Sequence, residues 1–196
     1  MEVVPASSNI HKANEITSLL PKFLNVSLQS DLGINSPAET ASTFVENALI
    51  KARHASALTK LPAIADDSGL CVRALDNRPG ILSARYAGES ATDKENLEKL
   101  LAELDNCKER DAFFHCVLVF LDYATSPTPL IAEASWHGEI CLTPSGSSGF
   151  GYDPVFYLHS LGVTAAEIST SQKNSISHRG TALRHLKEKL LEYYSP

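Results

Sequence analysis

The sequence lacks the cysteine patterns that mark zinc sites and disulfide scaffolds. Its 196 residues include only four cysteines, with no C-x-x-C pair and no Cys-His spacing suited to zinc. Scattered cysteines of this kind are typical of proteins kept reduced inside the cell. We therefore expect four reduced thiols in a cytoplasmic protein, at Cys71, Cys107, Cys116 and Cys141.

Long apolar runs and an excess of basic residues are also missing. No stretch is apolar enough to span a bilayer and no signal segment is found, so we expect no membrane partner. The 17 basic against 23 acidic residues give a formal charge of -6, which argues against a general nucleic-acid surface. A small local cluster of Lys and Arg could still hold a polyphosphate. Without repeats or linkers, the chain is expected to form one domain over residues 1–196.

The most informative stretch is an apolar run, residues 61–65, followed by Asp66-Asp67-Ser68-Gly69. The apolar run predicts a buried strand that ends at the two carboxylates. Adjacent carboxylates at the edge of a core repel each other unless a cation lies between them. Hard oxygen ligands of this kind suit Mg²⁺, which usually takes one or two protein carboxylates and leaves its other positions to water and phosphates. The alternative is an ordinary strand end followed by a turn.

The chain begins with a short predicted strand, residues 2–6, a polar turn and a helical pattern that continues through Leu19 and Leu20. A turn between a strand and a helix start presents backbone N–H groups that can bind an anion. Lys12 adds a positive charge there. The turn lacks the Walker spacing, so a simple helix cap is the alternative interpretation. A second short strand is predicted from residue 23 to residue 28.

An amphipathic helix is predicted from the capping box Thr43-x-x-Glu46 and from apolar residues at helical spacing up to residue 55. Asn47, Lys51 and His54 fall on one polar stripe of this helix. Such a stripe is usually solvated. Glu39 precedes the helix, which leaves it able to point into a cleft.

The middle of the chain predicts a loop at residues 75–80, an unassigned segment at 81–88, and a helix that starts at the capping box Thr92-x-x-Glu95. Residues 113–121 form a continuous apolar run and residues 130–140 alternate, with a Pro-containing turn between them. These two runs predict an antiparallel hairpin and hence a mixed sheet. A further short strand is predicted at residues 155–157.

The last third contains a glycine-rich loop and a basic helix start. The loop at residues 144–154 holds three glycines and Phe150, whose ring offers a stacking face; a plain surface turn is the alternative. Lys173, His178 and Arg179 gather near a helix start for which Ser177 is the predicted cap. Because basic residues are unfavourable in a first helical turn, their presence suggests that an anion or another acceptor offsets them.

Taken together, these motifs resemble the inosine triphosphate pyrophosphatases, also called XTP/dITP diphosphohydrolases. Several independent motifs in the same order over nearly the whole chain make the resemblance specific. The motifs that carry it are Ser8-Asn9-Ile10-His11-Lys12, Glu39, residues 44–48, Lys51-Ala52, residues 65–70, Ser83-Ala84-Arg85-Tyr86, residues 149–154 and Ser177-His178-Arg179-Gly180.

The resemblance implies an α/β fold: an elongated mixed β-sheet flanked by helices, with two lobes and a central active-site cleft. It also implies a homodimer that hydrolyses the non-standard purine nucleoside triphosphates ITP, dITP and XTP to the monophosphate and pyrophosphate, with Mg²⁺ as cofactor. Phosphoryl transfer needs mainly positioning and charge neutralisation from a protein, which agrees with the basic and acidic residues found here.

By position, the resemblance implies a role for each motif. Glu39 and Asp67 would bind metal, with Asp67 acting on the water and Asp66 as a second ligand or outer partner. The loop from Phe150 through Gly151 and Tyr152 to Asp153 would hold the base with His178 and Arg179. The phosphates and sugar would be held by Ser7, Ser8, Asn9, Ile10, His11, Lys12, Lys51, Ser68 and Lys173. This chain has Ser8 and His11 where the family's first loop usually has glycines.

Two alternatives belong to other functional classes. A nucleotide sensor would keep the binding residues without turnover, although Glu39, Asp66 and Asp67 are more carboxylates than a binder needs beside phosphates. A pyrophosphatase for another nucleotide, such as a modified pyrimidine, is the second. Release of pyrophosphate or orthophosphate across a nucleotide panel would separate these possibilities.

Overall fold

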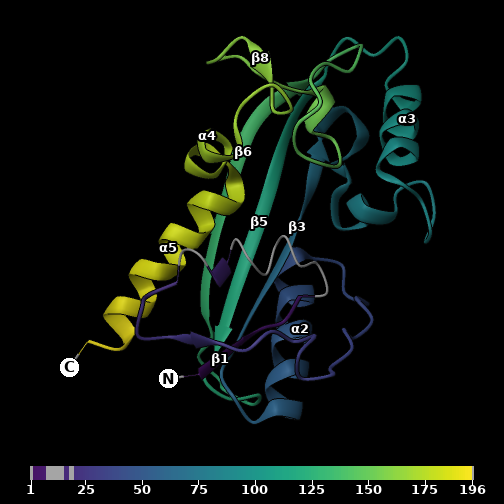
Figure 1. The fold of residues 1–196 in the computed structure, drawn as a ribbon. Helices are drawn as coiled ribbons and strands as arrows, with labels where there is room; N and C mark the ends of the chain where they lie inside the picture. Colours follow the sequence, from purple (N-terminus) through teal and green to yellow (C-terminus); the bar gives the residue numbers. More distant parts are fainter. Residues whose placement is uncertain (1, 8–15, 18–19, 196) are drawn as a thin grey trace. The chain divides into compact units, whose positions relative to one another are not determined.

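The protein is described from a computed structural model that covers residues 2–7, 16–17 and 20–195. Its described elements form a mixed sheet flanked by helices (Figure 1), with strand order β2-β1-β3-β5-β6-β7-β8 and β4 paired to β3. The elements are β1 (Glu2–Pro5), β2 (Asn25–Val26), α2 (Phe44–Thr59), β3 (Ala63–Val72), the 3-10 helix η1 (Arg73–Leu75), β4 (Arg78–Pro79), the 3-10 helix η2 (Gly80–Arg85), α3 (Asp93–Glu103), β5 (Asp111–Leu121), β6 (Leu130–Ile140), the 3-10 helix η3 (Asp153–Val155), β7 (Phe156–Leu158), β8 (Val163–Thr164), α4 (Thr170–Ile176) and α5 (His178–Tyr193).

The sheet is mixed, as predicted. Strand β1 pairs in parallel with β2 and with β3, whereas the β3–β4, β6–β7 and β7–β8 pairs are antiparallel. The α/β class and the mixed sheet predicted from the sequence are therefore confirmed. No helix in the described part of the chain is both long and apolar enough to cross a membrane.

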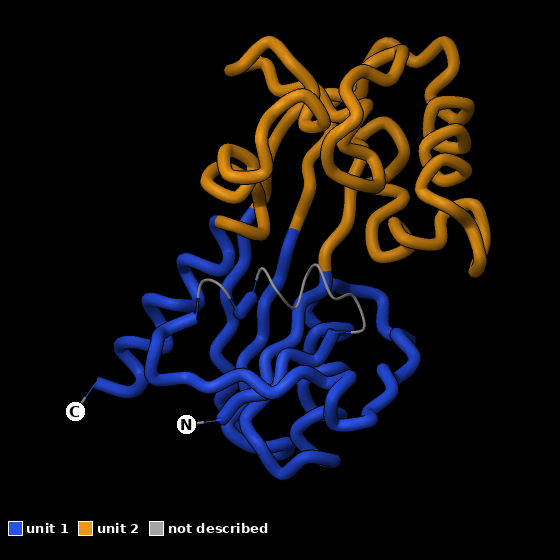
Figure 2. Tube along the Cα trace, viewed as in Figure 1, with its two compact units in different colours: residues 1–67, 116–134, 181–196 blue, residues 68–115, 135–180 orange. Residues whose placement is uncertain are grey.

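The chain divides into two compact units (Figure 2). The first unit comprises residues 1–67, 116–134 and 181–196, and the second comprises residues 68–115 and 135–180. The chain passes from one unit to the other within β3, β5 and β6 and near the start of α5. Asp67 and Ser68 are thus neighbours in the chain but belong to different units.

In the described part of the first unit, α2 packs on one face of the sheet and α5 packs on the other. Three alanines of α2, Ala48, Ala52 and Ala55, pack against the strand residues of one face. Leu183, Leu186 and Leu190 of α5 pack with residues of β1, β3, β5 and β6 in a separate cluster. Alternating strand residues point to opposite faces, which is why neighbouring positions such as Leu118 and Val119 contribute to different clusters.

The second unit has one apolar core. Leu97, Leu100 and Leu104 follow the helical period along α3 and pack with strand residues that include Leu70, Phe114, Trp136 and Phe156. Thr92 caps α3 with the reciprocal hydrogen bonds of a capping box, as predicted. These contacts fix α3 and the second half of β3 within one core.

The largest departure from the sequence prediction concerns Asp66 and Asp67. We expected the strand to end at these carboxylates, but β3 continues through them to Val72. Only 1% of Asp66 and 5% of Asp67 is exposed. Both side chains are part of the interior of the first unit, because a cation from another element lies beside them.

Smaller departures involve short elements. The loop predicted at residues 75–80 contains β4, the unassigned segment at 81–88 contains η2, and the strand predicted at 155–157 is shifted by one residue to β7. The strand predicted at 23–28 is reduced to β2, and α4 was not predicted. Strand β6 has the predicted bounds, and all four cysteines are free thiols.

Candidate active site

Four charged residues of the first unit form a carboxylate–lysine cluster: Glu39, Lys51, Asp66 and Asp67. Lys51 Nζ lies 2.6 Å from Glu39 Oε1 and 3.3 Å from Asp67 Oδ1. Only 8% of Lys51 is exposed. Glu39 and Asp67 thus share one buried ammonium, and the charge of Asp66 acts on Lys51 without a direct contact within 4 Å.

The alanines of α2 explain how a lysine reaches this position. Small side chains let the helix approach the sheet closely, and Lys51 lies between Ala48 and Ala52 on the buried side. Asn47, one turn earlier, accepts a hydrogen bond from the backbone N–H of Ala41 at 3.1 Å, and so holds the segment that carries Glu39 beside the helix.

The predicted solvated stripe on this helix is therefore wrong for Asn47 and Lys51, which are buried, although His54 is partly exposed. Both buried residues have polar partners, which offset the cost of removing them from water. Two polar residues buried on one side of α2 indicate a binding or catalytic site in the interior of the first unit.

The charges of the cluster determine the ionisation of Lys51. Burial alone would lower the pKa of Lys51, but the neighbouring charges of Asp66, Asp67 and Glu39 outweigh burial and raise the pKa above its ordinary value of 10.5. Lys51 is therefore a fixed positive charge at neutral pH. It can neutralise part of an anion or of the carboxylates themselves.

The side-chain oxygens of the cluster determine whether it can bind Mg²⁺. Among residues 2–7, 16–17 and 20–195, no three His, Cys, Asp or Glu side chains are grouped so that they could hold a metal ion by themselves. Neighbouring strand residues point to opposite faces, so Asp66 and Asp67 face different sides of β3. Glu39 and Asp67, which share Lys51, fit a Mg²⁺ ion that takes two protein carboxylates and completes its shell with water and phosphates.

In the second unit, an aromatic loop, residues 149–153, lies against Lys173. Phe150 is 45% exposed, whereas only 2% of Asp153 is exposed. The carboxylate of Asp153 accepts the backbone N–H of Phe150 at 2.9 Å and forms an ion pair with Lys173. Lys173 Nζ also lies 4.6 Å from the centre of the Phe150 ring. The buried carboxylate thus holds both the aromatic ring and the lysine above it.

The start of α5 supplies the other two predicted residues of this unit. Ser177 accepts the N–H of Gly180 at 3.2 Å and is the predicted cap. Arg179 donates to Ser68 Oγ at 3.1 Å, and its guanidinium lies 5.9 Å from the Phe150 ring centre. The His178 ring stacks on Phe114 with centres 4.9 Å apart and an angle of 9°. One face of the imidazole is thereby covered.

Gly180 allows α5 to begin close to α4. A Cβ atom at this position would overlap the backbone carbonyl of Asn174. In an ordinary helix, replacing Gly by Ala stabilises the protein by roughly 0.5–1 kcal/mol. Here the added methyl group must push α4 away.

We therefore expect Gly180→Ala to destabilise the protein by about 1–3 kcal/mol, the usual cost of overpacking, instead of stabilising it. Urea unfolding of the parent and the variant measures this difference. Ser175→Ala, on exposed α4, is the control and should change the free energy of unfolding by less than about 0.5 kcal/mol. A stabilised Gly180→Ala protein would show that α4 does not limit the space at this glycine.

The structure brings most of the predicted residues into two groups. Glu39, Lys51, Asp66 and Asp67 form the cluster of the first unit, and Ser68, Lys173, Arg179 and the aromatic loop form a group in the second. Lys173, expected with the phosphates, contacts Asp153 and Phe150 in this structure. Ser7 is described at the end of β1, whereas Ser8, Asn9, Ile10, His11, Lys12 and the helix predicted after them fall largely outside the described residues.

Sequence reasoning missed Asn47 and Phe114 as parts of these groups. Asn47 was assigned to a surface stripe. Its place one turn before Lys51, with alanines beside both residues, is the sequence signal that could have found it. Phe114 lies in a continuous apolar run, where nothing distinguishes the aromatic ring that supports His178 from any other core residue.

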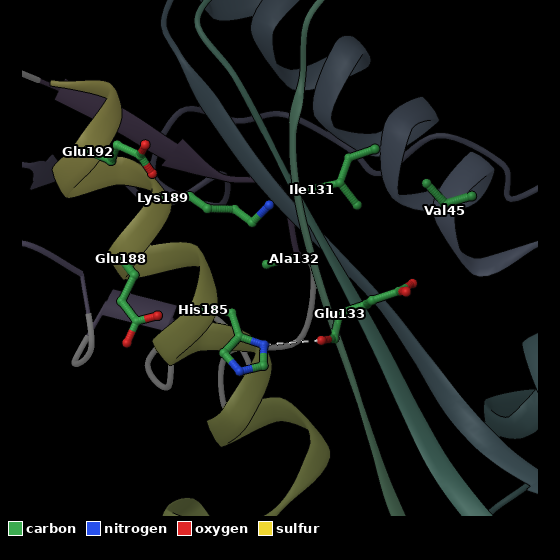
Figure 3. A pocket seen from close by; sticks show the side chains of 8 residues that line it. All are labelled: Val45, Ile131, Ala132, Glu133, His185, Glu188, Lys189 and Glu192. Atoms are coloured by element: carbon green, nitrogen blue, oxygen red, sulfur yellow. Dashed lines mark hydrogen bonds between the residues drawn. The ribbon is translucent and has the colours of Figure 1, made fainter.

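A groove in the first unit has a volume of about 650 Å³ and contains none of the predicted polar site residues (Figure 3). His185 of α5 donates from Nδ1 to the carbonyl oxygen of Glu133 at 3.3 Å, because a carbonyl can only accept. The groove is lined by Val45, Ile131, Ala132, Glu133, His185, Glu188, Lys189 and Glu192. Three glutamates against one lysine make it a poor site for a triphosphate.

The fold and the two groups define the class of protein: an α/β protein with a buried carboxylate–lysine cluster in one unit and a basic aromatic loop in the other. The sequence matches the Ham1 family over residues 3–189, and the chain belongs to this family.

Its relatives and similar structures cover almost the same length. A protein named dITP/XTP pyrophosphatase from Erwinia tasmaniensis is 56% identical over 188 residues, which are 94% of this chain and 92% of that protein. The Escherichia coli K12 protein of the same name is 53% identical over 96% of this chain and 98% of its own length. A HAM1 protein structure from Coxiella burnetii has a TM-score of 0.94 at 47% identity and covers 98% of this chain and 99% of its own.

Proposed function

We propose that this protein hydrolyses the non-standard purine nucleoside triphosphates dITP, XTP and ITP to the monophosphate and pyrophosphate, and so removes them from the nucleotide pool. The names of relatives more than 50% identical support the reaction and the substrates. The observation that carries the proposal is the carboxylate–lysine cluster. Two of its carboxylates, Glu39 and Asp67, share one buried lysine, an arrangement that suits a cation-assisted attack of water on a phosphate.

Each residue of the cluster has a separate task in this proposal. Asp67 orients the attacking water and accepts its proton. Lys51 holds the carboxylates of Glu39 and Asp67 in place and contributes a fixed positive charge toward the phosphates. Mg²⁺, when bound by Glu39 and Asp67, would acidify water and neutralise phosphate charge. Asp66, on the other face of β3, would act as an outer partner that adjusts the charge around Lys51.

Base recognition is assigned to the second unit. Phe150 offers an exposed ring for the base, and Arg179 offers guanidinium N–H donors. Only 5% of His178 is exposed and its ring stacks on Phe114, so we expect it to meet a base with the edge of the ring. The 6-oxo group of hypoxanthine and xanthine accepts hydrogen bonds from such donors, whereas the 6-amino group of adenine would face them with its own N–H groups.

The domain organisation, the oligomeric state and the location of the protein are inferred from the same family resemblance and from its cysteines. We propose one functional domain over residues 1–196, because the family match spans both units. A homodimer is proposed from the family resemblance. A cytoplasmic location is supported by the four free cysteines. Ser7 to Lys12 are proposed to bind phosphate, as a turn between a strand and a helix often does.

Glu39 provides a test of the metal. Glu39→Gln removes one carboxylate charge at nearly constant shape, so the Mg²⁺ concentration needed for half-maximal activity should rise by about tenfold or more, since changes even outside the ligand shell cost about 10–100-fold in metal affinity. A Mg²⁺ titration of activity at saturating ITP measures this concentration. Glu46→Gln, on the exposed surface of α2, is the matched control and should give the same titration curve as the parent. Identical curves for Glu39→Gln and the parent would remove Glu39 from the metal site.

Arg179 provides a test of the base. Arg179→Ala should lower kcat/KM for ITP by about 10²-fold or more and change ATP hydrolysis far less, because unpaired polar groups in a site cause strong discrimination. Lys12→Ala should lower kcat/KM for both nucleotides about equally, since both carry the same phosphates. If Arg179→Ala kept the parent's ratio of ITP to ATP, base recognition would lie elsewhere.

The product of hydrolysis tests the reaction itself. With Mg²⁺ and ITP, the proposal expects one pyrophosphate and one IMP for each ITP consumed, measured by ion-exchange chromatography. Orthophosphate and IDP would indicate an ordinary phosphatase activity. Tight nucleotide binding without any product would favour the sensor alternative.

A further inference from the structure

The aromatic loop has a backbone that its own sequence restrains weakly. Gly149 and Gly151 have φ angles of +78° and +62°. Glycine adopts these angles without strain but also has the most conformational freedom to lose. The position of Phe150, whose ring is 45% exposed, therefore depends on hydrogen bonds: one to Asp153 within the loop and others that reach the loop from other elements.

Two such bonds come from outside the loop on the C-terminal side of Phe150. The backbone N–H of Gly151 donates to Asp93 Oδ2 at 2.7 Å. The hydroxyl of Tyr152 donates to the carbonyl oxygen of Ser83 at 2.9 Å. Asp93 is the first residue of α3 and Ser83 belongs to η2, so both anchors come from elements that the core of the second unit already fixes.

Asp93 is the more informative of the two anchors. Its own backbone is held by the capping box of Thr92 and Glu95. Its carboxylate faces Tyr152 as well as Gly151: burial raises the pKa of Tyr152, and the charges of Tyr86 and Asp93 raise it further. The residue is exposed, so it makes no contribution to the apolar core.

An acidic residue in a first helical turn also interacts favourably with the helix dipole, whatever else it contacts. That role would explain a negative charge at position 93. It would not explain a hydrogen bond to an amide 58 residues away, next to the exposed aromatic ring.

We infer that Asp93 is a positioning residue that favours 6-oxopurine bases over adenine, because it fixes the Gly151 amide and thereby the place of the Phe150 ring. That ring lies 5.9 Å from the guanidinium of Arg179, which would donate to the 6-oxo group. This inference rests on the proposed function. Asp93 itself does not touch the nucleotide in this account. The contact it supports is made by the ground state and the transition state alike, so its loss should raise KM for ITP and leave kcat nearly unchanged.

The test compares Asp93→Ala with Asp93→Asn. Both remove the charge that interacts with the helix dipole, but the Asn side chain retains an oxygen that can accept the Gly151 N–H. For Asp93→Ala we expect kcat/KM for ITP to fall by about three- to tenfold, the factor that corresponds to one lost hydrogen bond, with little change for ATP. Asp93→Asn should keep at least half of the parent's ITP to ATP ratio. Lys94→Ala, an exposed truncation in the same turn, should behave as the parent.

A second measurement is independent of activity. Hydrogen exchange of the Gly151 amide in the nucleotide-free protein should be faster in Asp93→Ala than in the parent and close to the parent's rate in Asp93→Asn. Thermal unfolding should place the two variants within a few degrees of each other, because they share the loss of charge. A large stability difference between them would show that the bond serves the fold as a whole and would overturn the inference.

The outcomes separate this inference from the proposed function. If the parent fails to hydrolyse ITP, the proposed function is wrong. The exchange rates still measure whether Asp93 holds the Gly151 amide. If the parent prefers ITP and Asp93→Ala keeps that preference, the inference is wrong even where exchange becomes faster. Equal losses of kcat for ITP and ATP would likewise overturn it, because they would indicate general damage to the site.

Discussion

Replacing Asp67 by Asn is expected to lower kcat for ITP hydrolysis by about 10²–10⁴-fold, the range that a positioned general base contributes. The change keeps the shape of the side chain and one oxygen that can accept from Lys51, 3.3 Å away in the parent. It removes the charge that would orient water and bind metal. Initial rates at saturating Mg²⁺ and ITP measure the loss.

The same variant should be about as stable as the parent. Asparagine has the shape of aspartate and retains an oxygen that can accept the hydrogen bond from Lys51. Loss of activity with retained or increased stability is typical of a residue kept for function. Asp111→Asn, at the exposed start of β5, is the matched control and should alter neither quantity. Activity within a few-fold of the parent would mean that Asp67 is not the base.

Replacing Lys51 by Met is expected to reduce the free energy of unfolding by about 3–5 kcal/mol at neutral pH, as when one partner of a buried ion pair is removed. Methionine can fill much of the space of the lysine stem, but Glu39, Asp66 and Asp67 would then lack their shared cation. Urea unfolding measures the difference. Lys94→Met, on the exposed surface of α3, should cost less than about 0.5 kcal/mol.

The pH dependence of the stability lost in Lys51→Met identifies the cause of that loss. The folded-state pKa of Lys51 is raised, so the stabilisation from its charge is fully present below the ordinary value of 10.5 and is lost as the pH rises through the folded pKa. The gap between the parent and Lys51→Met should therefore stay constant from neutral pH to about pH 10 and shrink at higher pH. Lys51→Arg keeps the charge and should be the milder variant. A gap that is small or absent at neutral pH would contradict the electrostatic role of Lys51.

Local patterns predicted the long elements well. Residues 130–140 alternate in polarity and form β6 with those bounds, and Thr92 with Glu95 forms the predicted capping box. Each of these signals lies within a few residues and does not depend on a distant partner. The strands β4, β7 and β8 have only two or three residues, and their formation depends on neighbouring strands, so periodicity gave little or no warning of them.

The buried charges could not be predicted from local pattern, because each depends on a residue far away in the chain. Asp67 appeared to end a strand, since carboxylates are rarely buried. It is tolerated inside because Lys51, 16 residues earlier, is also buried. Asp93 follows the cap Thr92, and nothing near it in the sequence indicates the amide 58 residues later that it holds. The resemblance to a family named most of the site residues but supplied none of these contacts.

The most direct test of the account is a comparison of kcat/KM for ITP, dITP and XTP with values for ATP, GTP and dCTP, measured as pyrophosphate release with Mg²⁺ and with Asp67→Asn as the blank. The account predicts that the three non-standard purines are preferred over ATP by about 10²-fold or more, as expected where mismatched polar groups exclude the wrong base. It also predicts almost no pyrophosphate from Asp67→Asn. Equal rates for ITP and ATP, or a preference for the pyrimidine, would contradict it.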